Sequence, residues 1–328
     1  MRSLDMEGLG QFFILGYEGE APSTDFLKLV RKYDVSGIIF FARNITSPSQ
    51  LAETIGQLKS YFKSTPLLAI DQEGGRINRI TQNFPLFPAN RIYAENKDRK
   101  GVKEAYQTTA RELFKLGINL NLVPVADTLG AGESFMGDRS FGNDVDTVVE
   151  FTSIAIKTVK QAKILTCAKH FPGIGSLVKD PHEVLPQLPI SRKEFEQREF
   201  IPFKVAIKSG VDCVMTTHVI APVLDRKPVT FSKKVVTDIL QKKLKFRGLI
   251  LSDDMEMKAV ANNFDFKEAC TNAFLAGHDQ ILICHSLDRQ VQVLEHFEKL
   301  VCDKKIAGGL VKKRAEKVLK FKKTKLKS

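Results

Sequence analysis

Asp180 and His182 are two ionisable side chains whose spacing suits proton transfer. In an Asp-x-His pair the carboxylate accepts a proton from one imidazole nitrogen, and the other nitrogen is left to exchange protons near neutral pH. Pro172, Gly173 and Gly175 precede the pair and indicate a flexible loop that would swing it over a site. A polar surface loop would have the same composition, so this hypothesis depends on partners elsewhere in the chain.

Lys169 and His170 stand where the apolar run of residues 164–167 stops. A parallel strand would deliver both side chains at its carboxyl end, which is the side of an α/β sheet where ligands bind. We therefore expect this strand end, and the loop that carries Asp180 and His182, to hold the chemistry.

A second group of polar residues follows another apolar run, in the segment Asp71-Gln-Glu-Gly-Gly-Arg-Ile-Asn-Arg79. The Gly74-Gly75 pair permits a tight turn that brings acidic and guanidinium groups over the site. Asp71 suits a bidentate grip on sugar hydroxyls, and Arg79 suits a hydroxyl, a carbonyl or a carboxylate. The alternative is that Asp71 and Arg79 pair only with each other.

Two further candidates follow the fourth and seventh strands of the predicted fold. The long segment of residues 130–142 offers Arg139 as a ligand, with a salt bridge to Asp138 as the alternative. Asp253 follows the apolar residues 249–251, and a carboxylate there is a natural nucleophile for a sugar C1, because an anion stabilises the oxocarbenium-like transition state. We expect Asp254 to face elsewhere and to cap the next helix.

Strand-like apolar runs alternate with helix-like segments along nearly the whole chain. The eight pairs are 11–17 with 23–33, 37–41 with 48–62, 67–71 with 100–115, 119–126 with 145–162, 164–170 with 191–208, 212–218 with 232–243, 248–253 with 266–276, and 280–284 with 287–301. This pattern predicts a closed (β/α)8 barrel, with a doubly wound sheet as the alternative. We expect one domain over residues 1–328, with a basic helix or tail from about residue 305 to 328.

The barrel hypothesis makes a test within the sequence, because functional polar residues should follow the strands rather than precede them. They do so after strands two to eight: Arg43 and Asn44, Asp71, Asp127, Lys169 with His170, His218, Asp253 with Asp254, and His285. Together these residues predict a polar pocket at one end of the barrel.

The net charge of +12 raises the question of nucleic-acid binding, but residues 312–327 hold nine Lys or Arg against one Glu, which is +8 in one segment. We favour a terminal amphipathic helix with a solvated basic face, which leaves weak attraction to anionic polymers or lipid open. No apolar stretch approaches the ~20 residues of a membrane span, and no apolar signal core follows Met1. The five scattered cysteines suit reduced thiols, and we expect a cytoplasmic protein.

Taken together, these motifs closely resemble the family 3 glycoside hydrolases, in particular the bacterial β-N-acetylglucosaminidases of the NagZ type. The motifs are Lys169-His-Phe-Pro-Gly173, Asp180-x-His182, Asp71-x-Glu-Gly-Gly-Arg76, Gly137-Asp-Arg-Ser-Phe141 and Ser252-Asp-Asp-x-Glu-Met257. They occur in the family's order with compatible spacings over nearly the whole chain.

The resemblance implies that Asp253 is the nucleophile of a retaining hydrolase and that His182, assisted by Asp180, is the acid/base. It also implies that five residues hold the N-acetylglucosamine hydroxyls: Asp71, Arg79, Arg139, Lys169 and His170. Such enzymes cut N-acetylglucosamine from muropeptides in peptidoglycan recycling and need no metal or cofactor. The expected partner is therefore a small carbohydrate, bound by a monomer, with no nucleic acid.

Ile174 and Pro181 depart from the family pattern, in which a second histidine and commonly a serine stand at these positions. Three alternatives remain at this point. They are a phosphorylase that uses phosphate in place of water, a non-catalytic sugar-binding barrel, and a zinc hydrolase built on His170 and His218.

Overall fold

The structure is a computed structural model that describes residues 8–178, 180 and 184–326. Within these residues, eight parallel strands close into a barrel in the order β1-β10-β9-β6-β5-β4-β3-β2, which confirms the predicted (β/α)8 fold. The strands are β1 (Phe13–Leu15), β2 (Gly37–Phe40), β3 (Leu67–Ile70), β4 (Leu120–Asn121), β5 (Leu165–Phe171), β6 (Cys213–Thr216), β9 (Leu249–Asp254) and β10 (Gln280–Ile283).

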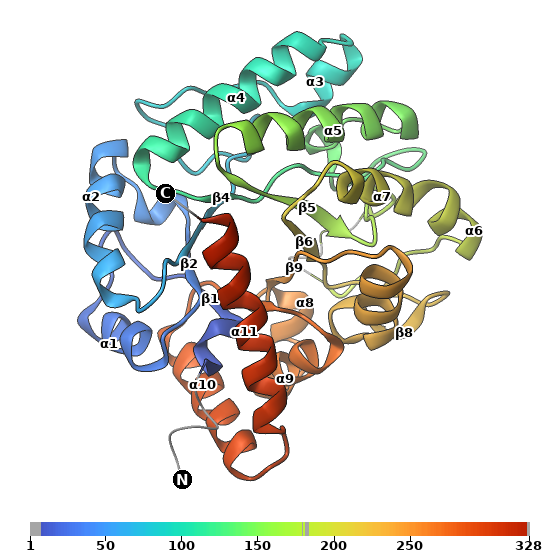
Figure 1. The fold of residues 1–328 in the computed structure, drawn as a ribbon. Helices are drawn as coiled ribbons and strands as arrows, with labels where there is room; N and C mark the ends of the chain where they lie inside the picture. The colour runs from blue at the N-terminus through green and yellow to red at the C-terminus, as the bar shows by residue number, and fades with distance from the viewer. Residues whose placement is uncertain (1–7, 179, 181–183, 327–328) are drawn as a thin grey trace.

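Helices surround the barrel (Figure 1). They are α1 (Thr24–Tyr33), α2 (Pro48–Leu58), α3 (Asn90–Glu95), α4 (Arg99–Leu116), α5 (Val145–Gln161), α6 (Arg192–Glu194), α7 (Phe200–Lys208), α8 (Lys258–Ala261), α9 (Phe266–Ala276), α10 (Leu287–Cys302) and α11 (Gly308–Lys325), with π-helical segments at Phe195–Glu199 and Lys234–Lys243. Many begin at a Ser or Asp whose side chain accepts a backbone amide of the first turn, as Ser23 does for α1 and Asp144 for α5.

The barrel interior is apolar because every barrel strand contributes at least one aliphatic or sulfur-containing side chain to it. Ile14, Ile39, Leu120 and Leu282 are examples, and all four are buried. Strands that are covered by helices outside and by side chains inside have no solvated face. This explains why the strand sequences are continuously apolar instead of alternating.

Two details differ from the predicted elements. The regular part of the fourth strand covers only Leu120–Asn121, and beyond it the chain stays joined to β5 by a hydrogen bond from Cys167 N to Val123 O and by a bridge between Val125 and Lys169. A two-stranded antiparallel sheet, β7 (Ile220–Ala221) with β8 (Asp225–Pro228), follows β6 and was not predicted.

Helix α11 crosses the barrel at the ends where its strands begin (Figure 1). Val318 of α11 is buried in the barrel-interior cluster. Three lysines of α11 contact residues at this end of the barrel. Lys322 is buried and donates to Gln11, Ser36 and Ser64, Lys325 pairs with Asp212 at 2.8 Å, and Lys317 pairs with Asp279 at 2.6 Å. The expectation of a solvated basic face is wrong for Lys322, whereas Lys317 and Lys325 pair with acidic residues and stay partly exposed.

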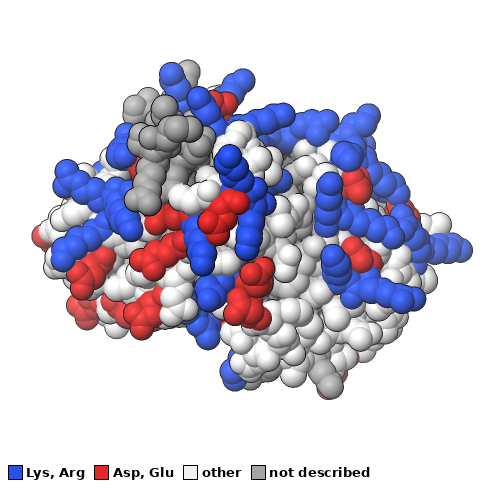
Figure 2. Space-filling model, turned by 90° about the horizontal axis from the view of Figure 1, so that it is seen from below, with Lys and Arg blue, Asp and Glu red and all other residues white. Residues whose placement is uncertain are grey.

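Basic and acidic side chains are mixed on the surface of the molecule that Figure 2 shows. Figure 2 shows one face of the molecule on which Lys and Arg side chains stand among Asp, Glu and uncharged side chains. No helix among the described residues has the length and apolar character needed to cross a membrane.

Candidate active site

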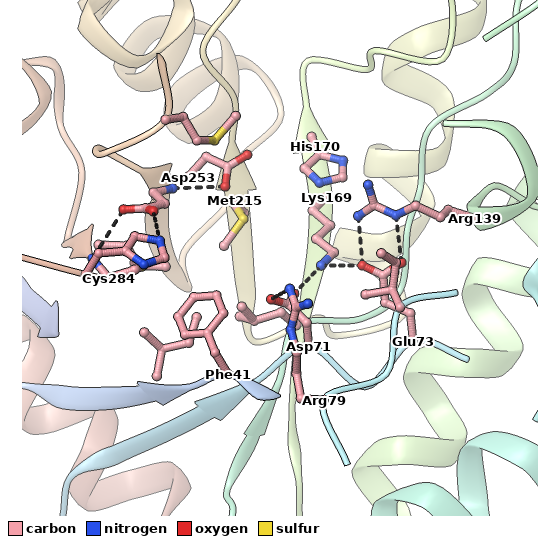
Figure 3. Close-up of a pocket in the computed structure, with 17 residues that line it drawn as sticks. Phe41, Asp71, Glu73, Arg79, Arg139, Lys169, His170, Met215, Asp253 and Cys284 are labelled. Atoms are coloured by element: carbon pink, nitrogen blue, oxygen red, sulfur yellow. Dashed lines mark hydrogen bonds and ion pairs between the residues drawn. The ribbon is translucent and has the colours of Figure 1, made fainter. Parts of the chain in front are cut away.

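A cavity of about 320 Å³ opens at the carboxyl ends of the barrel strands (Figure 3). Six of the predicted site residues line it: Asp71, Arg79, Arg139, Lys169, His170 and Asp253. They come from four different strands or the loops that follow them, β3, β4, β5 and β9, so the barrel gathers residues that are far apart in the sequence. Asp180 is described but does not line this cavity, and His182 and Pro181 lie outside the described residues.

A network of five charged side chains forms one wall of the cavity. Lys169 Nζ lies 2.6 Å from Asp71 Oδ1 and 2.7 Å from Glu73 Oε1. Arg139 grips both oxygens of Glu73, at 2.9 and 2.8 Å, and Arg79 reaches Asp71 Oδ2 at 3.2 Å. Two carboxylates and three cations therefore alternate along this wall.

The network stays ionised at neutral pH. Burial opposes the charged form of Glu73, but Arg139 and Lys169 outweigh it and hold the pKa of Glu73 at about 2. The pKa of Asp71 is likewise held far below its ordinary value, because Lys169 and Arg79 outweigh its burial. The pKa of Lys169 is raised, since Asp71 and Glu73 outweigh its own desolvation. The wall therefore offers fixed donors and acceptors, which is what recognition of sugar hydroxyls requires.

Arg79 carries a donor that the protein leaves unpaired. Its Nε is buried and has no hydrogen-bond partner among the described residues, although its terminal nitrogen reaches Asp71. A buried N–H without a partner is unfavourable, so Nε is an unsatisfied donor in this wall. The guanidinium also lies 5.3 Å above the ring of Phe41, which lines the cavity.

The turn that carries Glu73 and Arg79 depends on two glycines, as predicted. Gly74 and Gly75 have φ values of 97° and 55°, in the left-handed region. A side chain at Gly75 would also approach Ala89 to 2.6 Å. The sharp turn brings the chain back over the barrel mouth, where Asp71 and Arg79 meet.

His170 is held by a carboxylate behind the cavity wall. Asp127 is fully buried, and its carboxylate lies 2.8 Å from His170 Nδ1 and accepts the amide of Ile174 at 2.8 Å. The contact favours a proton on Nδ1, which leaves Nε2 as the nitrogen available to a ligand. Ile174 thus fixes the start of the loop through its backbone while its side chain is buried.

Asp253, near the end of β9, lies on the opposite side of the cavity from Glu73 and Arg139 (Figure 3), and its neighbour Asp254 also lines the cavity. Asp253 accepts the amide of Asp254 at 2.9 Å. Behind them, His218 is fully buried and lies 2.9 Å from the carbonyl oxygen of Asp254 through Nε2 and 2.8 Å from the Thr230 hydroxyl through Nδ1. His218 therefore supports the end of β9, and it does not line the cavity.

The structure decides against one alternative, the Asp138–Arg139 salt bridge, and corrects one expectation, the position of Asp254. Asp138 does not pair with Arg139: it pairs with Arg76 at 3.0 Å, while Arg139 turns inward to Glu73. Asp254 does line the cavity and does not cap α8, whose cap residue is Met257. Its carboxylate instead accepts the amides of Glu256 and Cys284.

Sequence reasoning missed Glu73 as a site residue. Glu73 stands two positions after Asp71, so in an extended segment both side chains point to the same side, and this spacing was the available signal. The sequence predicts Asp127 and His285 as members of the polar pocket, without a role for either. His170 and His218, the histidines of the zinc alternative, are held by different partners, and the described residues contain no group of three His, Cys, Asp or Glu suited to a metal.

Comparison with known proteins gives a consistent picture. The family model of the glycosyl hydrolase family 3 N terminal domain matches residues 4–321. A beta-hexosaminidase of Photobacterium profundum is 33% identical over 284 residues, which cover 86% of this chain and 83% of the relative. A beta-hexosaminidase of Haemophilus influenzae is 32% identical over 290 residues, which cover 87% and 82%.

Two solved structures share the fold of this chain, and their own chains differ in length. A glycoside hydrolase family 3 beta-N-acetylglucosaminidase from Paenibacillus sp. str. FPU-7 superposes with a TM-score of 0.94 at 31% identity, and the match covers 99% of this chain but only 63% of that longer chain. NagZ from Neisseria gonorrhoeae, solved with N-trifluoroacetyl-D-glucosamine, superposes with a TM-score of 0.80 at 25% identity and covers 94% and 97% of the two chains.

Proposed function

We propose that this chain, which belongs to glycosyl hydrolase family 3, is a retaining β-N-acetylglucosaminidase that releases terminal non-reducing N-acetylglucosamine from peptidoglycan fragments. The proposal treats residues 1–328 as one catalytic domain. One observation carries it: the Asp253 carboxylate shares a cavity with an ionised wall of Asp71, Glu73, Arg139 and Lys169. The names of the relatives, beta-hexosaminidase and beta-N-acetylglucosaminidase, supply the reaction class.

The wall and the carboxylate have different tasks in this proposal. Asp71, Arg79, Arg139, Lys169 and His170 bind the hydroxyls of the terminal sugar. Binding there fixes the sugar ring with its anomeric carbon toward Asp253. The cavity size of about 320 Å³ suits one sugar unit and leaves the rest of the substrate at the rim.

The reaction then takes two steps. An oxygen of Asp253 forms a bond to the anomeric carbon while the glycosidic C–O bond breaks, and His182 gives its proton to the departing oxygen. Asp180 accepts the hydrogen bond of the other imidazole nitrogen and stabilises the charged form of His182. In the second step water attacks the same carbon, His182 takes the proton back, and Asp253 leaves with net retention of configuration.

A histidine acid has a physical advantage in this role. An ordinary imidazole loses its proton near pH 6.5, so it is suited to act as an acid and then as a base near neutral pH, whereas a carboxylic acid needs burial to reach that range. The proposal places the enzyme in the cytoplasm, where muropeptides are recycled. All five cysteines are free thiols, including Cys167 and Cys213 on neighbouring strands, which suits a reducing compartment.

The first experiment is release of p-nitrophenol from its β-N-acetylglucosaminide by the purified protein and its variants. We expect Asp253→Ala to lose activity by roughly 10⁴-fold or more, because it removes the nucleophile. His182→Ala should lose about 10²–10⁴-fold on a muropeptide, which needs a protonated leaving group, and less on the activated p-nitrophenyl substrate. Asp138→Asn, which alters a rim carboxylate that pairs with Arg76, is the matched control and should stay within about threefold.

The same assay separates the alternatives. Faster turnover with added phosphate, with N-acetylglucosamine 1-phosphate as product, would make the protein a phosphorylase. Equal activity in wild type and Asp253→Ala would overturn the assignment of the nucleophile, and binding of N-acetylglucosamine without any turnover would indicate a sugar-binding barrel.

A further inference from the structure

A histidine–aspartate pair to which the proposed reaction gives no task lies on the wall of the cavity. His285 follows β10 and Asp254 ends β9, and both residues line the cavity. His285 Nε2 lies 3.1 Å from Asp254 Oδ2, and the centre of the imidazole ring lies 5.4 Å from that of the Phe41 ring, with the two planes tilted by 36°. The pair is therefore built into the site, one residue away from the proposed nucleophile Asp253.

The groups that face His285 favour its charged form. Asp254 at Nε2 is the closest, and Glu18 Oε1 lies 3.7 Å from Nδ1, so each ring nitrogen faces a carboxylate. Glu256 accepts the backbone amide of His285. Arg43 lies over the ring of Phe41, and its positive charge opposes the charged form of His285. The hydrogen bond to Asp254 outweighs burial and Arg43, and it raises the pKa of His285.

Asp254 is fully occupied as a result. Its Oδ1 accepts the amides of Glu256 and Cys284, at 3.1 and 3.2 Å, and its Oδ2 faces the imidazole. Within the described part of the chain, Asp253 accepts one hydrogen bond, from the amide of Asp254 to its Oδ1. Asp253 and Asp254 are consecutive residues that both line the cavity, so their negative charges repel each other unless a cation compensates.

We propose that His285 is a positioning residue of the active site: its imidazolium neutralises Asp254, so that Asp253 stays ionised as the one carboxylate free to attack the sugar. The proposal rests on the proposed function, because it assigns a task relative to the nucleophile. It also divides the work of the three histidines around the cavity. His170 presents Nε2 to a ligand, His218 supports the strand from behind, and His285 compensates charge.

The direction of the effect follows from the charges. Without the imidazolium, the negative charge of Asp254 is uncompensated and opposes the negative charge that Asp253 needs as a nucleophile. In kcat/KM the acid limb reports groups of the free enzyme that must be ionised. His285→Gln keeps an NH group for Asp254 Oδ2 but removes the charge, which makes it the informative substitution.

We expect His285→Gln to move the acid limb of kcat/KM upward by about one pH unit, which is roughly a tenfold loss at pH values below the limb. The loss should lie in kcat, with KM changed by less than about twofold, and the alkaline limb should stay in place. His296→Gln is the matched control, because His296 lies on α10 outside the cavity. A uniform loss at all pH values in His285→Gln would indicate a merely structural role and would overturn the proposal.

Removal of both charges gives a reciprocal test. The double variant Asp254→Asn with His285→Gln should return the acid limb toward its wild-type position, because the charge that the imidazolium compensates is gone as well. If the double variant shifts the limb as far as His285→Gln alone, charge compensation is not the task of His285.

A readout that does not need turnover separates this proposal from the proposed function. The pKa of His285, followed by NMR of its ring proton and assigned by its loss in His285→Gln, should lie above the ordinary histidine value and should fall in Asp254→Asn. A pKa of His285 that does not change in Asp254→Asn would overturn the pairing even in an active enzyme. An inactive wild type with a raised pKa at His285 would instead refute the proposed function.

Discussion

Replacement of Glu199 by Gln should stabilise the protein, and the gain should grow as the pH rises from about 5 to 8. Glu199 ends the π-helical segment Phe195–Glu199 and is 1% exposed. Neither of its carboxyl oxygens has a hydrogen-bond partner among the described residues. The guanidinium of Arg198 lies 3.2 Å from Oε1 but is not aligned to donate to it. The carboxyl is packed against the loop after β5, since a side chain at Gly173, where φ is 109°, would meet its Oε2 at 2.5 Å.

The magnitude follows from the pKa of this carboxyl. Burial raises it from 4.5 to about 8, with Arg198 opposing the rise and Asp127 and Glu194 adding to it. Between these two pKa values the folded protein holds a proton that the unfolded chain has released, so the unfolding free energy of wild type falls as pH rises. From pH 5 to pH 8 this is about 3 units at ~1.4 kcal/mol each, or an upper limit of about 4 kcal/mol. Local relaxation and water penetration reduce such effects, so we expect about 2–4 kcal/mol.

Gln has nearly the shape of Glu and does not titrate, so the variant lacks this pH dependence. Its buried amide also lacks partners and has a cost of its own, but that cost is independent of pH and cancels when the two proteins are compared at two pH values. Urea unfolding at pH 5, 6.5 and 8 gives the free energies by linear extrapolation. The quantity to plot is the unfolding free energy of the variant minus that of wild type.

Glu196→Gln is the matched control in the same helical segment. Lys243 binds the Glu196 carboxylate and lowers its pKa, so Glu196 is ionised in both states throughout this pH range and its variant should give a flat line. A flat line for Glu199→Gln as well would refute the reasoning, because it would mean that the buried carboxyl titrates alike in the folded and unfolded states.

Two further predictions concern buried charges at the two ends of the barrel. Glu73→Gln removes a buried counter-charge from Arg139 and Lys169. It should lower kcat/KM by at least about 100-fold in the p-nitrophenyl assay and destabilise the protein by about 3–5 kcal/mol. A loss of activity as small as that of Asp138→Asn would contradict this prediction. Burial lowers the pKa of Lys322 to about 8. The unfolding free energy of wild type should therefore rise between about pH 8 and 10, and that of Lys322→Met should not. Urea unfolding measures both, and an equal pH dependence of the two proteins would contradict the prediction.

The barrel and the place of its pocket could be predicted from the sequence because both depend on local patterns. Buried parallel strands are apolar throughout, and residues that follow such strands meet at one end of a barrel. Asp71, Lys169, His170 and Asp253 each directly follow or end such a run, so their convergence in one cavity needed no knowledge of the loops.

The pairing of the charges could not be predicted in the same way. Glu73 and Arg139 are 66 positions apart, and their contact depends on how two long loops fold against each other. Asp138, the neighbour of Arg139, pairs with Arg76 because the same loop turns one side chain inward and the other outward. The hairpin of β7 and β8 and the lysines of α11 under the barrel likewise depend on tertiary contacts, which composition and periodicity do not encode.

The central claim is that Asp253 forms a covalent bond to the sugar. Rapid acid quench of the enzyme during turnover of a slow 2-acetamido substrate, followed by proteolysis and mass spectrometry, tests it most directly. The account predicts one N-acetylglucosaminyl group on the peptide that contains Leu249–Asp254, attached to Asp253 and absent from Asp253→Ala. Turnover by wild type with no adduct, or with an adduct on another residue, would contradict it.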